Sequence, residues 1–476
     1  SLWAEHNKGP VWISTYTRNL QRQIDQELDK LYPDPAVKRR KVVIRKGREN
    51  YICLLNLEED ASRAQLGGGG IALGLMMRWV LATRDGDTGG DFPAWLPSLM
   101  GHGRTLGLTD RRGECIYSAC NHYQRCFIER SQRRARRADL VIANHALVMA
   151  NAVRASTAAD RPARIVFDEG HHLFDAADSA FSAHLCGMEA AELRRWIRGG
   201  EGGRGRRARG LEKRIGDLAG GSTPAGEALE HAMRAAALLP SQAWMNRLLS
   251  PGPAEGPAEA FLAGVHGHVH GRQAGNSGAY SLEAATNDPG PALIESASEL
   301  LQALVALAEP LRNLGQALAA RLDDDTAELD TSTRQRIEAA GRGLDWRIEM
   351  IAGWQSMLAD LQTGAPEGFV DWFSIERTGG HEADVGMHRH WIDPTHPFAE
   401  AVLREAHGVL ITSASLRDGG GPAAETEQKS KDAEEEHAEW LTAEVRTGAH
   451  HLILPPRRVS LRSPFDYPAQ TRIFIV

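Results

Sequence analysis

The sequence has 476 residues, 42% of them hydrophobic and 25% charged, which is typical of an ordinary soluble protein of about two to four domains. Its formal charge of −7 excludes a protein that is basic throughout, so any surface for nucleic acid must be local. Five cysteines and no signal peptide exclude a disulfide framework and indicate a cytoplasmic protein. No membrane partner is expected, because we find no apolar stretch of membrane-spanning length.

Both ends of the sequence predict breaks in a longer chain. The first residue is Ser1 rather than methionine, and the last four residues, 473–476, resemble a strand interrupted midway. We therefore expect the sequence to be a piece of a longer protein.

Strand and helix patterns alternate in the first third of the chain. Strands are expected at residues 11–15, 41–45, 139–143 and 165–167, and helices from residue 17, over 121–137 and from residue 144 or 145. This alternation predicts an α/β fold built on a parallel sheet.

Later in the chain the pattern becomes mainly helical. Apolar residues recur at three- and four-residue steps over 293–318, and a second such pattern covers 337–358, which predicts a long helical hairpin. We therefore expect an all-helical insertion over 175–385. A strand at 408–412 follows it, and a charged low-complexity insert at 419–436 is expected to be disordered.

The spacing of the cysteines is the most specific signal in the sequence. Cys53 is followed, after a long gap, by Cys115, Cys120 and Cys126. Four thiolates can hold a 4Fe–4S cluster or a tetrahedral zinc ion. Zinc ribbons usually offer two short paired spacings, and here only one side is clustered, which favours iron–sulfur. The other interpretation, a small buried hydrophobic residue, suits the isolated Cys186.

Six arginines lie next to the cysteines, at positions 125, 130, 133, 134, 136 and 137. On a helix they would surround most of the circumference, so some must face solvent whatever their function. Beside a cysteine cluster, such guanidinium groups suit contacts with a phosphate backbone, which is the interpretation we prefer. A second basic group at 194–209 lies among glycines and is interpreted as flexible surface, with DNA contact as the less favoured alternative.

An acid pair, Asp168 and Glu169, ends the strand at 165–167. Parallel strands present their carboxyl ends at the sheet edge where nucleotides bind, so Asp168 would hold Mg²⁺ through water and Glu169 would orient or deprotonate an attacking water. His171 would then relay the nucleotide state to Thr412 and Ser413. The alternative is that the two acids merely cap a helix, which leaves the second hydroxyl-rich strand end unexplained.

Alternate histidines at 266, 268 and 270 could share one face of a strand and bind a metal. No carboxylate or cysteine near them in the sequence supports a metal site. We therefore interpret them as a polar loop or strand face.

Together, these motifs resemble the bacterial DinG/YoaA-type members of the XPD-like iron–sulfur superfamily 2 DNA helicases. The matching stretches are 12–17 (motif Ia), 46–53 and 115–126 (cluster cysteines), 138–147 (before motif II), 168–171 (DEAH box), 412–416 (motif III) and 463–467 (start of the second motor domain). Gly170 replaces an alanine of the family, which we expect to be harmless, and Ser415 replaces a threonine. No Gly-x4-Gly-Lys-Ser/Thr phosphate loop occurs, so this chain alone should not hydrolyse ATP.

The resemblance implies a RecA-like motor domain of the P-loop NTPase type with an inserted iron–sulfur domain and an inserted helical Arch domain. The implied boundaries are 1–46, 138–174 and 386–454 for the first motor domain, 47–137 for the iron–sulfur domain, 175–385 for the Arch, and 455–476 for a linker and the start of the second motor domain.

The resemblance further implies a monomeric, ATP-driven 5′→3′ translocase on single-stranded DNA and duplex junctions, acting in DNA repair or replication-fork maintenance. DNA contacts are expected from Thr15, Arg18, Arg133, Arg134 and Arg137. The alternative is a non-motor nucleic-acid-binding module with a structural four-cysteine zinc or iron–sulfur site. Iron content and DNA-stimulated ATP hydrolysis would separate the two classes.

Overall fold

The computed structural model describes most of the chain, with gaps at its ends and in several loops. The described residues are 9–64, 70–93, 95–100, 107–110, 113–154, 161–201, 209–220, 223–250, 252–273, 278, 280–324, 328–417, 433–461 and 466–472. Four elements of the sequence interpretation lie outside them: residues 202–208, most of the charged insert, residues 463–465 and the last four residues.

A five-stranded, fully parallel sheet forms the first structural unit, in the order β2-β3-β1-β4-β9. Its strands are β1 (Val11–Thr15), β2 (Val42–Ile44), β3 (Leu140–Asn144), β4 (Arg164–Asp168) and β9 (Gly408–Thr412). All five predicted strands are thus confirmed to within a residue or two. The mixed α/β fold with a parallel sheet is consistent with a RecA-like fold.

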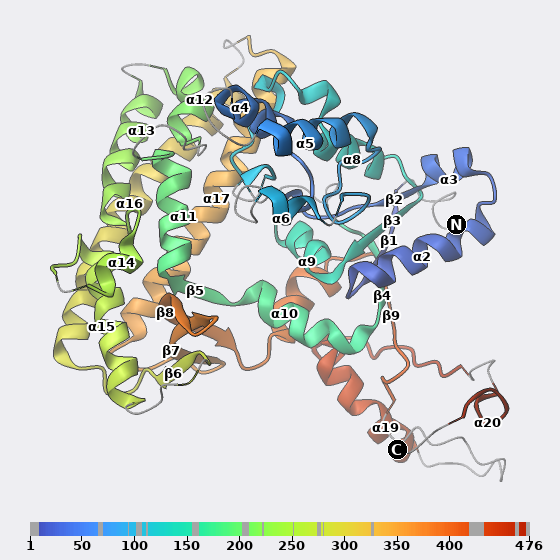
Figure 1. Cartoon of the computed structure of the whole chain (residues 1–476). Coiled ribbons are helices and arrows are strands. Elements are labelled where there is room, and N and C mark those ends of the chain that lie inside the picture. The colour runs from blue at the N-terminus through green and yellow to red at the C-terminus, as the bar shows by residue number, and fades with distance from the viewer. Residues whose placement is uncertain are drawn as a thin grey trace.

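Helices cover both faces of this sheet (Figure 1). Leu140 and Ile142 of β3 point toward one face, whereas Val141 and Ala143 point toward the other, since successive strand residues alternate. The first face is covered by α2 (Arg18–Leu31) and α3 (Pro35–Lys41). The second face is covered by α9 (His145–Arg154), α10 (Leu173–Phe181) and α18 (Thr395–Phe398). Helix α18 continues into a π-helical turn, Ala399–Leu403.

The segment between β2 and β3 folds around an apolar core of its own, which includes Ile52, Met76, Leu96 and Leu108. Its helices are α4 (Leu54–Ala64), α5 (Gly70–Ala82), α6 (Leu96–Met100) and α8 (Phe127–Ala135), with short 3-10 turns at Arg48–Asn50, Tyr117–Ala119 and Tyr123–Arg125. The helix predicted over 121–137 therefore begins only at Phe127, after the extended Cys126.

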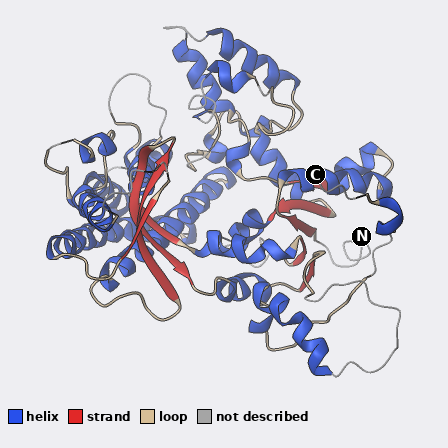
Figure 2. Cartoon of the chain, turned by 60° about the horizontal axis from the view of Figure 1, so that its bottom comes forward, coloured by secondary structure: helices blue, strands red, loops and turns tan. Residues whose placement is uncertain are grey.

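The segment between β4 and β9 is not all-helical, which corrects the sequence interpretation. It contains a four-stranded antiparallel sheet in the order β5-β8-β7-β6, seen among helices in Figure 2. The strands are β5 (Ala183–Cys186), β6 (Leu282–Ala285), β7 (Phe369–Thr378) and β8 (His381–Trp391). Gly379 and Gly380, both at positive φ, make the turn of the β7–β8 hairpin. The domain boundary expected at residue 385 falls inside β8.

The helices of this segment pack on one face of the antiparallel sheet and on each other. They are α11 (Gly187–Arg198), α12 (Leu211–Ala219), α13 (Pro224–Ala235), α14 (Trp244–Leu248), α15 (Pro257–Arg272), α16 (Pro291–Asp323) and α17 (Thr331–Asp360), with a 3-10 turn at Ala236–Leu238. The predicted long helical hairpin is α16 and α17. The three histidines at 266, 268 and 270 lie on α15, so their interpretation as a loop or strand face is wrong.

Among the described residues, α16 is the one helix that is long and apolar enough to cross a membrane by length and composition alone. The expectation that no segment reaches this length is therefore wrong. Its leucines, including Leu304, Leu311 and Leu314, are buried in the core that α16 shares with α13, α15 and α17.

After β9 the chain continues through α19 (Ala433–Arg446), a 3-10 turn at Ala449–His451, and the short α20 (Tyr467–Gln470). The insert expected to be disordered at 419–436 lies outside the described residues up to 432. Residues 433–436 form the first turn of α19, so the expectation is wrong for them.

Candidate functional site

The carboxyl ends of three neighbouring strands meet at one edge of the parallel sheet. Asp168 at the end of β4 is in register with Thr412 at the end of β9. On its other side, Thr15 of β1 donates a hydrogen bond from Oγ1 to Oδ2 of Asp168, at 3.2 Å. The structure therefore brings together the acid and the hydroxyl-bearing strand end that the sequence predicted to be neighbours.

Glu169 has a left-handed backbone conformation, with φ 56° and ψ 48°. A residue with a side chain in this region costs about 1–3 kcal/mol, and such residues concentrate at functional sites. Glu169 precedes the 3-10 turn Gly170–His172, but its side chain makes no capping hydrogen bond there. The helix-capping alternative is therefore not supported.

His171 connects the acid pair to the last strand of the sheet. Its Nδ1 lies 2.7 Å from Oγ of Ser413, just beyond β9, and 3.3 Å from Oε2 of Glu169. The predicted pairing of His171 with the end of β9 is thus present, and Ser413 rather than Thr412 makes the hydrogen bond.

An aromatic contact that the sequence interpretation missed joins the end of β1 to the same turn. The ring of Tyr16 stacks on His172, with ring centroids 3.9 Å apart and planes at 15°. His172 in turn lies 4.0 Å from the ring of His171. Two signals in the sequence could have indicated this contact. Tyr16 directly follows β1, and His172 is the second histidine after the acid pair.

A buried histidine, also missed, ties β1 to the start of α9. Nδ1 of His145 lies 2.7 Å from Oγ of Ser14, and both side chains are fully buried. Burial, together with the neighbouring imidazoles of His172 and His171, lowers the pKa of His145 to about 4. The histidine is therefore neutral at physiological pH and holds β1 in place by a neutral hydrogen bond.

This depressed pKa predicts a loss of stability in acid. In the unfolded chain His145 binds a proton as the pH falls below 6.5, whereas in the folded protein it binds one only near pH 4. The free energy of unfolding therefore falls as the pH is lowered between these two values. We expect the free energy of unfolding to drop by about 3 kcal/mol more in the unsubstituted protein than in His145→Gln over this range. Urea unfolding measured from pH 7 to pH 4 checks this, with the exposed His381→Gln as control. Parallel pH profiles in all three proteins would contradict it.

Gly170 lies against β9 and leaves no room for a side chain. A methyl group added to it would overlap Cγ2 of Ile411. Glycine therefore suits this position in this chain, because Ile411 occupies the space that the methyl group of the family's alanine would need.

We expect Gly170→Ala to destabilise the protein by about 1–3 kcal/mol, as overpacking does. Removing the obstruction with Ile411→Ala should offset part of this cost, so that the double variant is more stable than the sum of the two single effects. Urea denaturation of the four proteins of this cycle measures the coupling. Strict additivity would show that Ile411 is not the obstacle.

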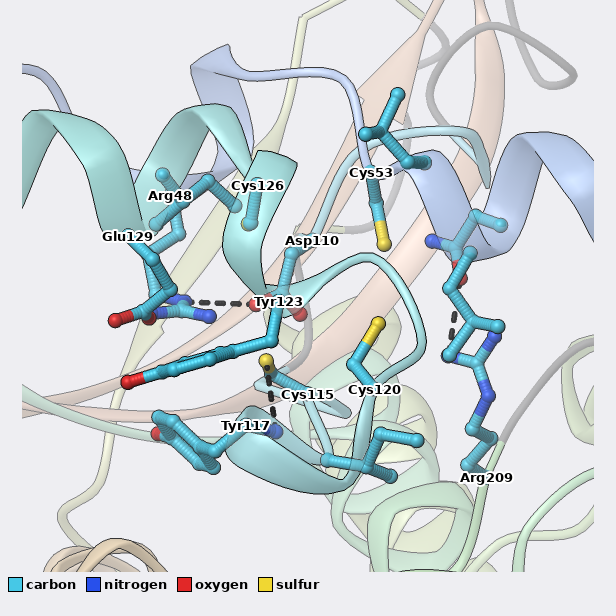
Figure 3. A pocket seen from close by; sticks show the side chains of 15 residues that line it. Arg48, Cys53, Asp110, Cys115, Tyr117, Cys120, Tyr123, Cys126, Glu129 and Arg209 are labelled. Carbon is cyan, nitrogen blue, oxygen red and sulfur yellow. Dashed lines mark hydrogen bonds and ion pairs between the residues drawn. The ribbon is translucent and has the colours of Figure 1, made fainter. Parts of the chain in front are cut away.

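The four predicted ligand cysteines line one small pocket (Figure 3). Cys53 precedes α4 and is held beside the later cysteines by its backbone N–H, which donates to the carbonyl of Leu108 at 2.8 Å. Figure 3 shows the sulfurs of Cys53, Cys115 and Cys120 turned toward a common space, while Cys126 begins α8 at its side. The convergence of Cys53 with the distant trio is thus as predicted.

The spacing of the four sulfurs can be compared with that around a single zinc ion. Tetrahedral Zn–S bonds of about 2.3 Å would bring the sulfurs to roughly 3.8 Å from one another. In the described part of the chain, groups of three or more ligand atoms within 4.8 Å of one another occur at two places, and neither includes a cysteine. The described sulfurs therefore do not stand at the spacing of a bound tetrahedral zinc ion.

Charged side chains surround the pocket. Burial raises the pKa of Cys53 and of Cys115 to about 12, so both thiols are protonated when no metal holds them. Arg48, paired with Asp110 at 2.7 Å, lies close enough to Cys115 for its positive charge to oppose this rise. Cationic neighbours of this kind stabilise thiolates once a metal displaces the protons.

Arg209, from the segment interpreted as flexible surface, is a buried part of this pocket. It donates from Nη1 to Oδ1 of Asn56 at 3.0 Å and pairs through Nη2 with Glu59 at 2.8 Å. Nε of Arg194 likewise binds Glu201 at 2.6 Å. The interpretation of these two arginines as flexible surface is therefore wrong, because carboxylates and the amide oxygen of Asn56 hold them in place.

Of the predicted DNA contacts, Thr15 is contradicted. Its side chain is fully buried and donates to Asp168, so it cannot reach a strand of DNA. Arg18 is exposed at the start of α2, although its guanidinium also donates to Oδ1 of Asn50 at 2.7 Å.

The predicted arginines of α8 lie around its last turn. Arg133 lies over the ring of Tyr123, 5.5 Å from its centroid, Arg134 donates to the carbonyl of Arg39 at 2.8 Å, and Arg137 is exposed. The chain enters β3 directly after them. Because the sheet is parallel, Arg134 and Arg137 lie near its amino-terminal edge, opposite the edge that carries Asp168.

The parallel α/β sheet carries an acid pair at its carboxyl edge, and the histidine that follows this pair contacts a serine beyond β9. This arrangement is consistent with a RecA-like fold. No family model matches the chain. It is 30% identical over 193 residues to the ATP-dependent DNA helicase YoaA of Haemophilus influenzae, a match covering 38% of this chain and 29% of that protein. It is also 30% identical over 212 residues to the ATP-dependent helicase DinG of Mycobacterium tuberculosis, covering 40% of this chain and 31% of the relative.

A third relative, named 3′-5′ exonuclease DinG in Bacillus subtilis, is 23% identical over 492 aligned residues, covering 100% of this chain and 46% of the relative. These relatives confirm the resemblance predicted from the motifs: the chain is similar to proteins named DinG and YoaA. It spans less than half the length of each of the three.

Proposed function

We propose that this chain is part of an ATP-dependent DNA helicase, with the carboxyl edge of its parallel sheet as one wall of the nucleotide site. The observation that carries the proposal is the contact of His171 with both Glu169 and Ser413, directly beside Asp168. Asp168 would hold Mg²⁺ through water, and Glu169 would orient the attacking water. His171 would transmit the state of the nucleotide to β9.

The exposed side of β9 supports this assignment. Within the described residues β9 is the last strand of the sheet, and Leu410 is 59% exposed. Parallel sheets are normally covered on both faces. We propose that a further strand of the longer protein, carrying the phosphate-binding loop that this sequence lacks, pairs with β9 next to Asp168.

We further propose that the four cysteines hold a 4Fe–4S cluster. The shared pocket and the nearby guanidinium groups of Arg48 and Arg209 favour a negatively charged cluster. The described sulfurs also do not form a group of three within 4.8 Å of one another, as they would around a bound zinc ion. When bound, the cluster would cross-link the start of α4 to the loop between Cys115 and Cys126.

Five further parts of the proposed function rest on the family resemblance. They are 5′→3′ translocation on single-stranded DNA, action at duplex junctions, a role in DNA repair or replication-fork maintenance, a monomeric state and a cytoplasmic location. The exposed Arg18 and Arg137 are the described candidates for phosphate contacts among the predicted residues.

The proposal is tested with the longer protein that includes a phosphate-binding loop. We expect single-stranded DNA to stimulate its ATP hydrolysis, a duplex with a 5′ tail to be unwound faster than one with a 3′ tail, and about four iron atoms per chain. DNA binding without any ATP hydrolysis would instead support the non-motor module. Hydrolysis by a protein without bound iron would retain the motor and overturn the cluster.

A further inference from the structure

Two histidines of α15 lie on the same face of this helix, one turn apart. His266 and His270 are four residues apart, a spacing at which two imidazoles on a helix can bind one ion together. The helical pattern is clear from the buried Val265 and Val269, which point into the core on the adjoining face.

A carboxylate from a distant segment lies between the two imidazoles. Glu382, next to the Gly379–Gly380 turn at the start of β8, places Oε2 2.8 Å from Nε2 of His266 and Oε1 2.9 Å from Nε2 of His270. The two imidazole ring centroids are 4.5 Å apart, and the three ligand atoms all lie within 4.8 Å of one another. Glu382 lies 116 residues after His266 in the sequence, so only the tertiary structure brings this carboxylate to the histidines.

The cluster is sheltered but open to solvent on one side. The side chain of Glu382 is 14% exposed, that of His266 22% and that of His270 40%. Arg377 of β7 lies 3.3 Å from Oε1 of Glu382 and also donates to the carbonyl of Gly278 at 2.7 Å. Burial raises the pKa of Glu382, but hydrogen bonds from His266, Arg377 and His270 outweigh it and keep the pKa below its ordinary range.

We propose that His266, His270 and Glu382 bind one divalent transition-metal ion of the zinc type. Two imidazole nitrogens and one carboxylate oxygen form a ligand set that zinc uses in proteins, with water at the fourth position. Both imidazoles already direct Nε2 at the carboxylate. In the metal-bound form each imidazole would carry its ring proton on Nδ1, which leaves the Nε2 lone pair free for the metal.

Arg377 acts in this site as a support for the carboxylate. A guanidinium that holds one oxygen of a ligating carboxylate fixes its orientation, as outer hydrogen bonds do around metal ligands. Its positive charge weakens the attraction for a cation, which favours an ion that binds nitrogen strongly over Ca²⁺ or Mg²⁺.

The bound ion would fasten the tip of the β7–β8 hairpin to α15. The hairpin is the path by which the chain leaves this segment toward α18 and β9. Metal binding would therefore stabilise the segment that contains the antiparallel sheet, independently of any cluster in the cysteine pocket.

Zinc content provides the test. The unsubstituted chain, His270→Gln, Glu382→Gln and His268→Gln are equilibrated with micromolar zinc, dialysed and analysed for zinc by mass spectrometry. His268 is the matched control, because it lies on the same helix but its Nε2 faces the carbonyl of Ala285 instead of Glu382. Comparison between variants cancels any zinc held by the cysteines.

We expect the unsubstituted chain and His268→Gln to hold one zinc equivalent more than the other two variants, which should bind zinc at least tenfold more weakly in competition with a chelator. Zinc should also raise the melting temperature of the first two proteins only, and circular dichroism verifies that all four are folded. Equal zinc content in the four proteins, or a loss in His268→Gln as large as in His270→Gln, would overturn the proposal.

Discussion

Glu169→Gln is expected to reduce DNA-stimulated ATP hydrolysis by the longer protein roughly 10²- to 10⁴-fold, the usual contribution of a positioned general base. Glutamine keeps the size of the side chain but cannot accept a proton from water. The left-handed conformation of Glu169 belongs to the main chain, and the glutamine side chain can still reach His171, so ATP binding should persist. Steady-state hydrolysis and nucleotide binding, measured side by side, separate the two effects.

Glu230→Gln on α13 is a suitable control, because this exposed glutamate lies in the helical segment far along the chain from the sheet edge. It should retain the full rate. An unchanged rate in Glu169→Gln would refute the role of this acid, whereas loss of both binding and hydrolysis would point to a folding defect.

Cys120→Ser is expected to abolish iron binding, because three cysteines leave one corner of the cluster without its thiolate. The loop that carries Cys115 and Cys120 has short 3-10 turns and no strand, so it depends on the ligand for order. We therefore also expect faster hydrogen exchange across this loop. Iron content, the visible absorbance band and exchange measured by mass spectrometry test both consequences.

Cys186→Ser is the matched control for this substitution. Cys186 is buried in β5, where burial raises the pKa of its thiol and Asp384 accepts its hydrogen bond. Serine can keep that hydrogen bond, so iron content should be unchanged. Full iron in Cys120→Ser would exclude it as a ligand, and equal loss in both variants would indicate general destabilisation instead.

Much of the fold could be predicted because local patterns encode it. The apolar runs that became β1 and β9, and the periodic leucines of α16, each reflect contacts made within one element. The antiparallel sheet was missed in part because β5 and β6 have only four residues each. Segments of that length carry too little periodicity to be separated from the helices around them.

Some residues of the candidate sites could likewise be predicted from the sequence, and others could not. The identities of the acid pair and of the four cysteines were readable from spacing and from the strand that precedes Asp168. The burial of Thr15 was not, because a hydroxyl at a strand end can face solvent or a neighbouring strand equally well. The place of Arg209 in the cysteine pocket depends on Asn56 and Glu59, more than 140 residues earlier.

The sequence by itself determined the strands of the parallel sheet, the residues that end them and the long hairpin of α16 and α17, since these follow from the order of neighbouring side chains. Only the tertiary structure decided the partners: Ser14 for His145, Ser413 for His171, and Glu382 for the histidines of α15. Each of these pairs is separated by more than 100 residues. Such contacts arise from the path of the whole chain, which no local pattern records.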